Sequence, residues 1–320
     1  MINFQIETYS NVTKAQVQEE LSKIIEDFFQ NDKPNLDIIV ALSFEAAVRK
    51  FVPYETGEEY KANHGYGIAE GKTIPLLEKD RLRFVIIFDA KVFKDMSPPT
   101  FLGRWAKIVH ELIHVRIDLL RFRAIGALPF FAFPQSKMEI ARHNAVIFWE
   151  EYDVERTVAN LIITTMKAFK SRDNEIVQFT EMTGFADDIL RDLQSYEGLL
   201  IESVQRVLEP GTDLTRLTRS VTGTISGILL RLAKVYAVGE VSERVRSKIS
   251  EIENNVAFRK YFAQCWGRIL LQMREYYANR ASYRSEIIDV IANEYNDLLD
   301  KSGIRIEDAP TGFHVRMRIV

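Results

Sequence analysis

The sequence predicts an α+β fold that is mostly helical, with a small sheet early in the chain and an all-helical region after it. Two short β-branched, apolar runs, residues 36–42 and 82–88, have the length and composition of buried strands. Beyond Ser97, apolar residues recur at helical spacing almost without interruption to Asp300. We therefore expect one small sheet near the start and helices through most of the remaining chain.

The predicted elements follow a simple order. A strand over residues 3–8 precedes an amphipathic helix over residues 13–29, which the turn residues 31–34 end. The strand at 36–42 leads to a short helix at 44–51, a glycine-rich loop at 54–71, and paired strands at 73–77 and 82–88. A long helix is expected from Ser97 to Arg123, with prolines in its first turn, and a second from residues 138 to 170. Breaks are expected at Pro210-Gly211 and Val238-Gly239, and a strand at residues 312–320 closes the chain.

Composition excludes several classes of protein. The 320 residues carry 42 Lys and Arg against 45 Asp and Glu, so the net charge of -3 does not favour nucleic acid as a partner. The single cysteine, Cys265, allows no intrachain disulfide and suits a reducing compartment, where we expect it to be buried. No secretory signal is expected, and the apolar tract at 221–230 is shorter than the ~20 residues of a membrane span. These features predict a soluble, cytoplasmic protein of unspecified oligomeric state.

The chemistry of the chain is indicated by His110-Glu111-Leu112-Ile113-His114, which lies inside the predicted long helix. Residues four apart share one face of a helix, so His110 and His114 can offer two imidazoles to one metal ion. Glu111 can reach a water molecule bound to that ion and act as a general base. The pattern is typical of zinc hydrolases, which hold Zn²⁺ with three protein ligands and leave one position open.

The third ligand is predicted to be Glu151. It lies at helical spacing in an apolar row where an unpaired carboxylate would be costly to bury; the row is Ile147, Glu151, Val154, Val158 and Ile162. Glu155, one turn further, could hydrogen-bond a ligating imidazole without touching the metal. His143 stays open as an alternative ligand, whereas Glu150 and Asp153 are expected to be solvated.

His110-Glu111-x-x-His114 followed by Glu151-x-x-x-Glu155 resembles the gluzincin metallopeptidases. Over residues 73–163 the order of strands, motif helix and glutamate helix is similar to the ImmA/IrrE-type bacterial metallopeptidases. The resemblance implies that the catalytic domain, placed at residues 1–170, is zincin-like, but it does not extend to the helical C-terminal half. A polar break at residues 171–175 separates this domain from a helical domain at 171–320, which we expect to recognise a substrate or to regulate. The resemblance also implies a protein or peptide substrate, such as a bacterial regulator protein. Val154 and Glu155 depart from the family pattern, which has a small Ala and an Asp or Asn there.

Other residues leave alternatives open. His64, in the glycine-rich loop, could stabilise a transition-state oxyanion or simply lie at the surface. Asp118 could orient the imidazole of His114, or form an ion pair with Arg121. The alternative function is a non-catalytic helical interaction protein, or a toxin-like partner, in which the motif is incidental or holds a structural metal.

Overall fold

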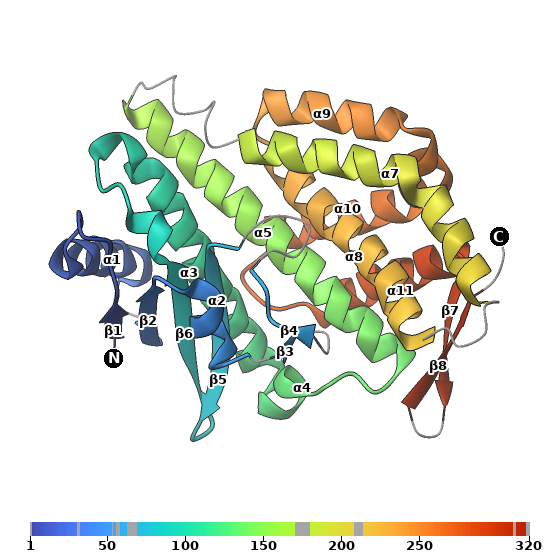
Figure 1. Cartoon of the computed structure of the whole chain (residues 1–320), viewed down its shortest axis with the longest axis horizontal. Helices are drawn as coiled ribbons and strands as arrows, with labels where there is room; N and C mark the ends of the chain where they lie inside the picture. Colours follow the sequence, from blue (N-terminus) through green and yellow to red (C-terminus); the bar gives the residue numbers. More distant parts are fainter. Residues whose placement is uncertain are drawn as a thin grey trace. The chain divides into compact units, whose positions relative to one another are not determined.

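The structure, a computed structural model, describes residues 2–30, 33–52, 54–55, 58–62, 69–169, 180–207, 214–309 and 312–317. It divides into two compact units, Met1–Phe131 and Ala132–Val320. The predicted fold class is confirmed, because the chain is mostly helical and has a small mixed sheet of four strands (Figure 1). The units are described separately.

The first unit is built on this four-stranded sheet. Its strands are β1 (Ile2–Ile6), β2 (Asn35–Ala41), β6 (Arg81–Asp89) and β5 (Gly71–Glu78), in that spatial order. β1, β2 and β6 run parallel, and β5 pairs antiparallel with β6 at one edge of the sheet. Two further short strands, β3 (Tyr54–Glu55) and β4 (Glu58–Glu59), pair only with each other among the described strands.

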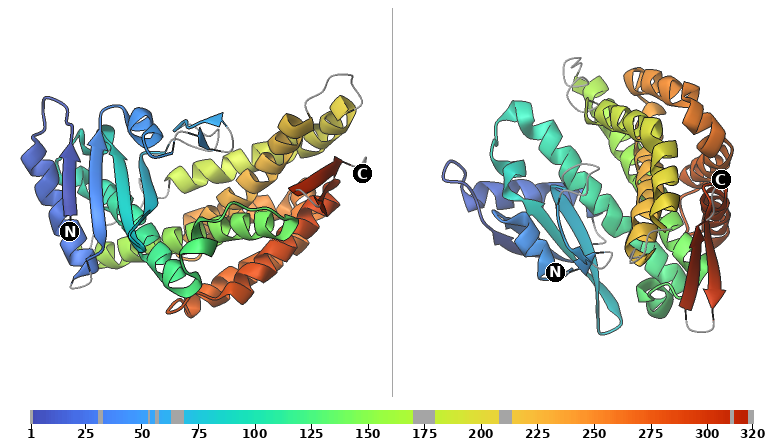
Figure 2. Two further views of the ribbon diagram at one scale, coloured as in Figure 1. Left: turned by 90° about the horizontal axis from the view of Figure 1, so that it is seen from below. Right: turned by 45° about the vertical axis from the view of Figure 1, so that its right-hand side comes forward.

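Helices cover both faces of the sheet, which explains why its central strands are almost continuously apolar. Helices α1 (Lys14–Phe29) and α3 (Phe101–Ile125) lie on one face, and the short α2 (Phe44–Arg49) lies on the other (Figure 2). Val85 and Ile87 belong to the core under α2. Because side chains alternate along a strand, Phe84, Ile86 and Phe88 point to the α3 face.

Helix α3, which carries the motif, is fixed at its start. The sequence predicts the helix from Ser97, but Pro98–Thr100 form a separate 3₁₀ turn and α3 begins at Phe101. The buried Arg104 donates to both carboxylate oxygens of Glu20 on α1, each at 2.9 Å, and also to the carbonyl oxygen of Asp95. The helix ends at Ile125, and the capping residue Gly126 has a φ of 77°, which favours glycine. The short α4 (Ala127–Phe131) completes the unit.

The described part of the second unit is a bundle of helices with one hairpin. The helices are α5 (Lys137–Phe169), α7 (Thr180–Val207), α8 (Leu214–Gly239), α9 (Glu243–Asn254), α10 (Ala263–Ala278) and α11 (Ser285–Lys301). A π-helical turn, Phe258–Phe262, precedes α10. Helix α8 packs against α5, α7 and α9. The closing hairpin pairs β7 (Ile304–Ala309) with β8 (Gly312–Met317); the sequence predicted the second strand but not the first.

The boundary between the units lies ahead of helix α5, whereas the sequence-based division was drawn after residue 170. Helix α5 is continuous and packs on α8 and α11, so its contacts join it to the C-terminal helices. The break expected at Val238-Gly239 is present as the end of α8. The polar break at 171–175, Pro210-Gly211 and His64 lie outside the described residues.

Within the described residues, one helical stretch, Val221–Gly239, is long and apolar enough to cross a membrane. It is longer than the apolar tract seen in the sequence because the helix continues past Arg231. In the second unit 67% of it is buried, which is the pattern of a core helix.

Candidate metal centre

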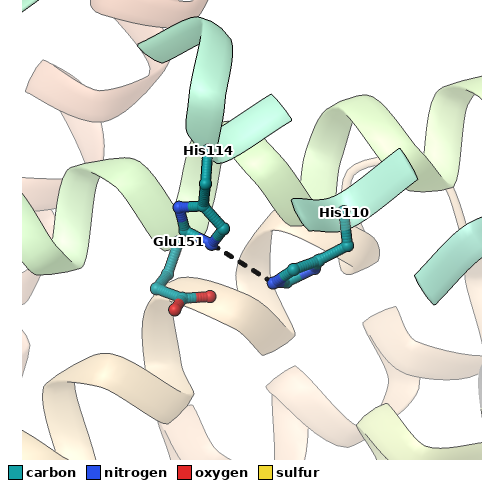
Figure 3. Close-up of side chains that lie close together, drawn as sticks. All are labelled: His110, His114 and Glu151. Atoms are coloured by element: carbon teal, nitrogen blue, oxygen red, sulfur yellow. Dashed lines mark hydrogen bonds between the residues drawn. The ribbon is translucent and has the colours of Figure 1, made fainter. Parts of the chain in front are cut away.

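The two motif histidines project from the same side of helix α3. Both are half-buried, and their Nε2 atoms lie 3.3 Å apart, with ring centroids separated by 5.0 Å (Figure 3). Two nitrogens that each lie about 2.0–2.1 Å from one tetrahedral zinc are roughly 3.3 Å apart. The same distance also permits the hydrogen bond between the rings that Figure 3 marks with a dashed line. The helical spacing of His110 and His114 thus gives a separation that suits a shared ion.

Glu111 faces the sheet, since one residue along a helix corresponds to a rotation of about 100°. Glu111 is buried, with 7% of its surface exposed. The hydroxyl of Thr73 on strand β5 lies 2.7 Å from Glu111 Oε2 and donates to it. The carboxylate of the predicted base therefore has a defined orientation relative to the sheet.

In the second unit, Glu151 and Glu155 lie one turn apart on helix α5 and share a lysine. Lys234 of α8 places Nζ 2.7 Å from Glu151 Oε2 and 3.5 Å from Glu155 Oε1. The side chains of Lys234 and Glu151 are each 19% exposed, and that of Glu155 is 13% exposed. Burial alone would lower the pKa of Lys234, but the two glutamates raise it above its usual value. Burial raises the pKa of Glu155, against the opposing effect of Lys234.

The first unit offers the imidazole nitrogens of His110 and His114, and the second unit offers the carboxylate oxygens of Glu151; Figure 3 draws these three side chains. Two imidazole nitrogens and one carboxylate oxygen are the donor types that catalytic zinc uses in proteins. Each of the three residues is half-buried, so water retains access to the donors. The chemistry of the donor set therefore fits zinc with one position left for water.

The other polar residues of helix α5 that were considered differ from one another in exposure. His143 is exposed, and Glu150 is half-buried. Asp153 was expected to be solvated, and this is wrong: it is 5% exposed, and Arg280 approaches its carboxylate at 3.8 Å. Arg280 comes from a distant part of the sequence, so the helical pattern around Asp153 could not reveal it.

Two further residues matched their expected roles. Asp118 forms the ion pair with Arg121 at 3.5 Å, the simpler of its two expected roles. Burial raises the pKa of Asp118 to about 6, with Arg121 opposing the shift. Cys265 is buried, as predicted.

Sequence reasoning missed Lys234 and Thr73, which contact the predicted site residues. Lys234 could have been noticed, because it and Arg231 are the two charged residues in the apolar stretch from Val221 to Gly239. Thr73 gave no local signal, because a threonine in a strand is ordinary. No protein-family model, no curated protein and no solved structure matches this chain, so its likeness to the gluzincins is carried by the motif residues alone.

Proposed function

We propose that the protein is a zinc-dependent metallopeptidase in which His110, His114 and Glu151 bind the ion and Glu111 is the general base. The observation that carries the proposal is the His110–His114 pair, whose Nε2 separation of 3.3 Å equals the spacing of two ligands on a tetrahedral zinc. A carboxylate as third ligand leaves one coordination position for water. A structural zinc would need a fourth protein ligand, so this donor set favours catalysis.

When bound, zinc supplies an acidified water and polarises the scissile carbonyl group. Glu111 is the residue that accepts the proton from the attacking water, and it then passes this proton to the leaving amine. The Thr73 hydroxyl donates to Oε2 of Glu111 and so limits the rotation of this carboxylate. Glu155 stays beside Lys234 and acts on the ligand set without binding the ion.

Strand β5 offers a place for a peptide substrate. It ends the order of strands in the four-stranded sheet, so its second edge has no partner among the described strands of that sheet. An extended peptide can add to such an edge through main-chain hydrogen bonds. Because Thr73 lies on this strand and contacts Glu111, a peptide bound along β5 would run past the general base. A protein substrate, such as a bacterial regulator, belongs to the proposal through the gluzincin resemblance. A cytoplasmic location belongs to it through the composition, with its single cysteine.

The experiment is to measure zinc in the purified full-length protein by mass spectrometry, with His110→Ala/His114→Ala as the test variant. His143→Ala is the matched control, because it removes an exposed histidine of helix α5. We expect about one zinc per chain in the parent and the control, and none in the double variant. Full zinc retention in the double variant would overturn the assignment and favour an incidental motif.

Catalysis is tested separately with Glu111→Gln, which keeps the shape of the side chain but cannot accept the proton. The probe is a pool of peptides from a digested bacterial proteome, with cleavage products identified by mass spectrometry. We expect the parent to cut a subset of peptides and Glu111→Gln to keep its zinc and cut none. Equal cleavage by both proteins would rule out the role of Glu111.

A further inference from the structure

We infer that Gly71 and Thr73 of strand β5 are positioning residues that set the carboxylate of Glu111 for proton transfer, an inference that rests on the proposed function. Neither residue is part of the motif, and neither contributes a metal-binding atom. Both act through Glu111, which they contact from the neighbouring sheet.

Strand geometry brings the two residues to the same face of β5. Side chains two apart on a strand point the same way. Thr73 pairs with Ile86 and Gly71 with Phe88, two positions that lie on the α3 face of β6. Ile74, the residue after Thr73, points to the opposite face and belongs to the core under α2. The alternation therefore directs positions 71 and 73 at helix α3.

The hydroxyl of Thr73 fixes one carboxylate oxygen. It lies 2.7 Å from Glu111 Oε2 and 3.1 Å from the main-chain oxygen of Glu111. A hydroxyl has one hydrogen to donate, and the shorter contact to a charged oxygen is the stronger bond. Thr73 is β-branched, so its χ1 angle is restricted and the hydroxyl keeps its direction. Rotation of the Glu111 carboxylate is thereby limited.

Gly71 makes room for the other oxygen. A Cβ atom at position 71 would lie 2.6 Å from Glu111 Oε1 and 2.9 Å from Cδ, closer than real Cβ contacts. The φ angle of Gly71 is not among the positive values, so the glycine is needed for space and not for its backbone conformation. A side chain at position 71 would clash with the Glu111 carboxylate in the position that the Thr73 hydrogen bond holds. The carboxylate would then have to leave that position.

The strand gives these contacts a rigid base. Strand β5 pairs with β6 along its whole length, from Gly71 opposite Phe88 to Glu78 opposite Arg81. Sites held on paired strands are more exact than sites held on loops. A misplacement of about 1 Å can cost on the order of 100-fold in rate, so the base needs such support.

The test uses Thr73→Val, Thr73→Ser and Gly71→Ala in the full chain. Valine keeps the shape of threonine without the hydroxyl, and serine restores the hydroxyl. The matched controls are Thr164→Val, at an exposed threonine of α5, and Gly267→Ala, where an added Cβ meets nothing within 4 Å. Four quantities are measured: zinc per chain, the position of the Glu111 carboxylate in crystal structures, and kcat and KM for the library peptide that the parent cuts fastest.

We expect every variant to keep about one zinc. Thr73→Val and Gly71→Ala should lower kcat by about 10- to 100-fold, with little change in KM, and their crystal structures should show a displaced carboxylate. Thr73→Ser and both controls should match the parent in rate and geometry. A Glu111 carboxylate in the parent position in both Thr73→Val and Gly71→Ala would overturn the inference, as would an unchanged kcat.

The failure of the proposed function would look different. If the parent cuts no peptide, the metallopeptidase proposal fails, and the crystal structures alone decide whether Gly71 and Thr73 position Glu111. If zinc is lost in Thr73→Val while it is kept in both controls, Thr73 supports metal binding, and its assignment as a positioning residue of the base is overturned.

Discussion

Replacing Lys234 with methionine should destabilise the metal-free protein strongly. Methionine has a similar length and fills space adaptably, so the loss of charge is the main change. The ammonium lies 2.7 Å from Glu151 and 3.5 Å from Glu155. At an effective dielectric constant of about 20 these separations correspond to roughly 6 and 5 kcal/mol of Coulomb energy. Most of this energy is offset by the cost of burying the ammonium group.

The measurable loss is smaller than the Coulomb sum. Removing one partner of a buried ion pair costs about 3–5 kcal/mol. For a domain the size of the second unit, each kcal/mol shifts Tm by about 2–4 °C, so Lys234→Met should lower Tm by about 6–20 °C. Differential scanning calorimetry in the presence of a chelator measures this shift. Adding zinc should recover part of the loss, because the ion brings positive charge to Glu151.

The control for Lys234→Met is Lys260→Met. Lys260 lies 2.9 Å from Glu197, but the two side chains are 57% and 51% exposed, and exposed pairs contribute little to stability. Its Tm should stay close to that of the parent. A metal-free Lys234→Met protein as stable as Lys260→Met would refute the reasoning. A large decrease in the Tm of Lys234→Met that zinc does not reduce would support the stabilising role of Lys234. It would count against Glu151 as a zinc ligand.

Two other predictions concern the ligand set and pH. Glu151→Ala should lose zinc almost completely, whereas Glu155→Ala should keep a site weakened about 10- to 100-fold; zinc titration distinguishes them, and equal affinities would contradict the assignment. Asp118 has a pKa of about 6 in the folded protein against 3.8 for its ordinary value, so the folded state binds its proton more tightly. Stability should therefore fall as pH rises from about 4 to 6, and the loss should reach about 3 kcal/mol and level off near pH 7. The free energy of unfolding of Asp118→Asn, measured by urea denaturation, should rise relative to that of the parent as the pH increases over this range. A difference in unfolding free energy that does not change with pH would argue against the pKa shift of Asp118.

Local patterns in the sequence predicted the parts of the fold that depend on neighbouring residues. The strand at residues 82–88 and the motif helix could be found from the sequence. The spacing of the apolar residues in each reflects which of its own side chains are buried. The pairing of His110 and His114 follows from helix geometry, which needs no tertiary contact.

Contacts between distant segments could not be predicted in this way. Lys234 reaches Glu151 across 83 positions, which is 234 minus 151, and nothing in the pattern of either helix specifies that meeting. Thr73 and Glu111 are 38 residues apart, and Asp153 is covered by Arg280 from after helix α10. Strand β7 was missed because it is a short run directly after the end of helix α11, Ser285–Lys301.

The proline in the middle of strand β5 has a consequence for self-association. An unpaired strand edge is a template on which copies of a protein can aggregate. Pro75 has no N–H, and proline in a sheet is confined to positions whose N–H side faces away from the partner strand. A second strand lying along β5 would therefore lose a hydrogen bond at its centre. A short peptide placed beside residues 71–74 would avoid that position. The edge can thus accept a brief extended segment while resisting the long, continuous pairing that leads to insoluble assemblies.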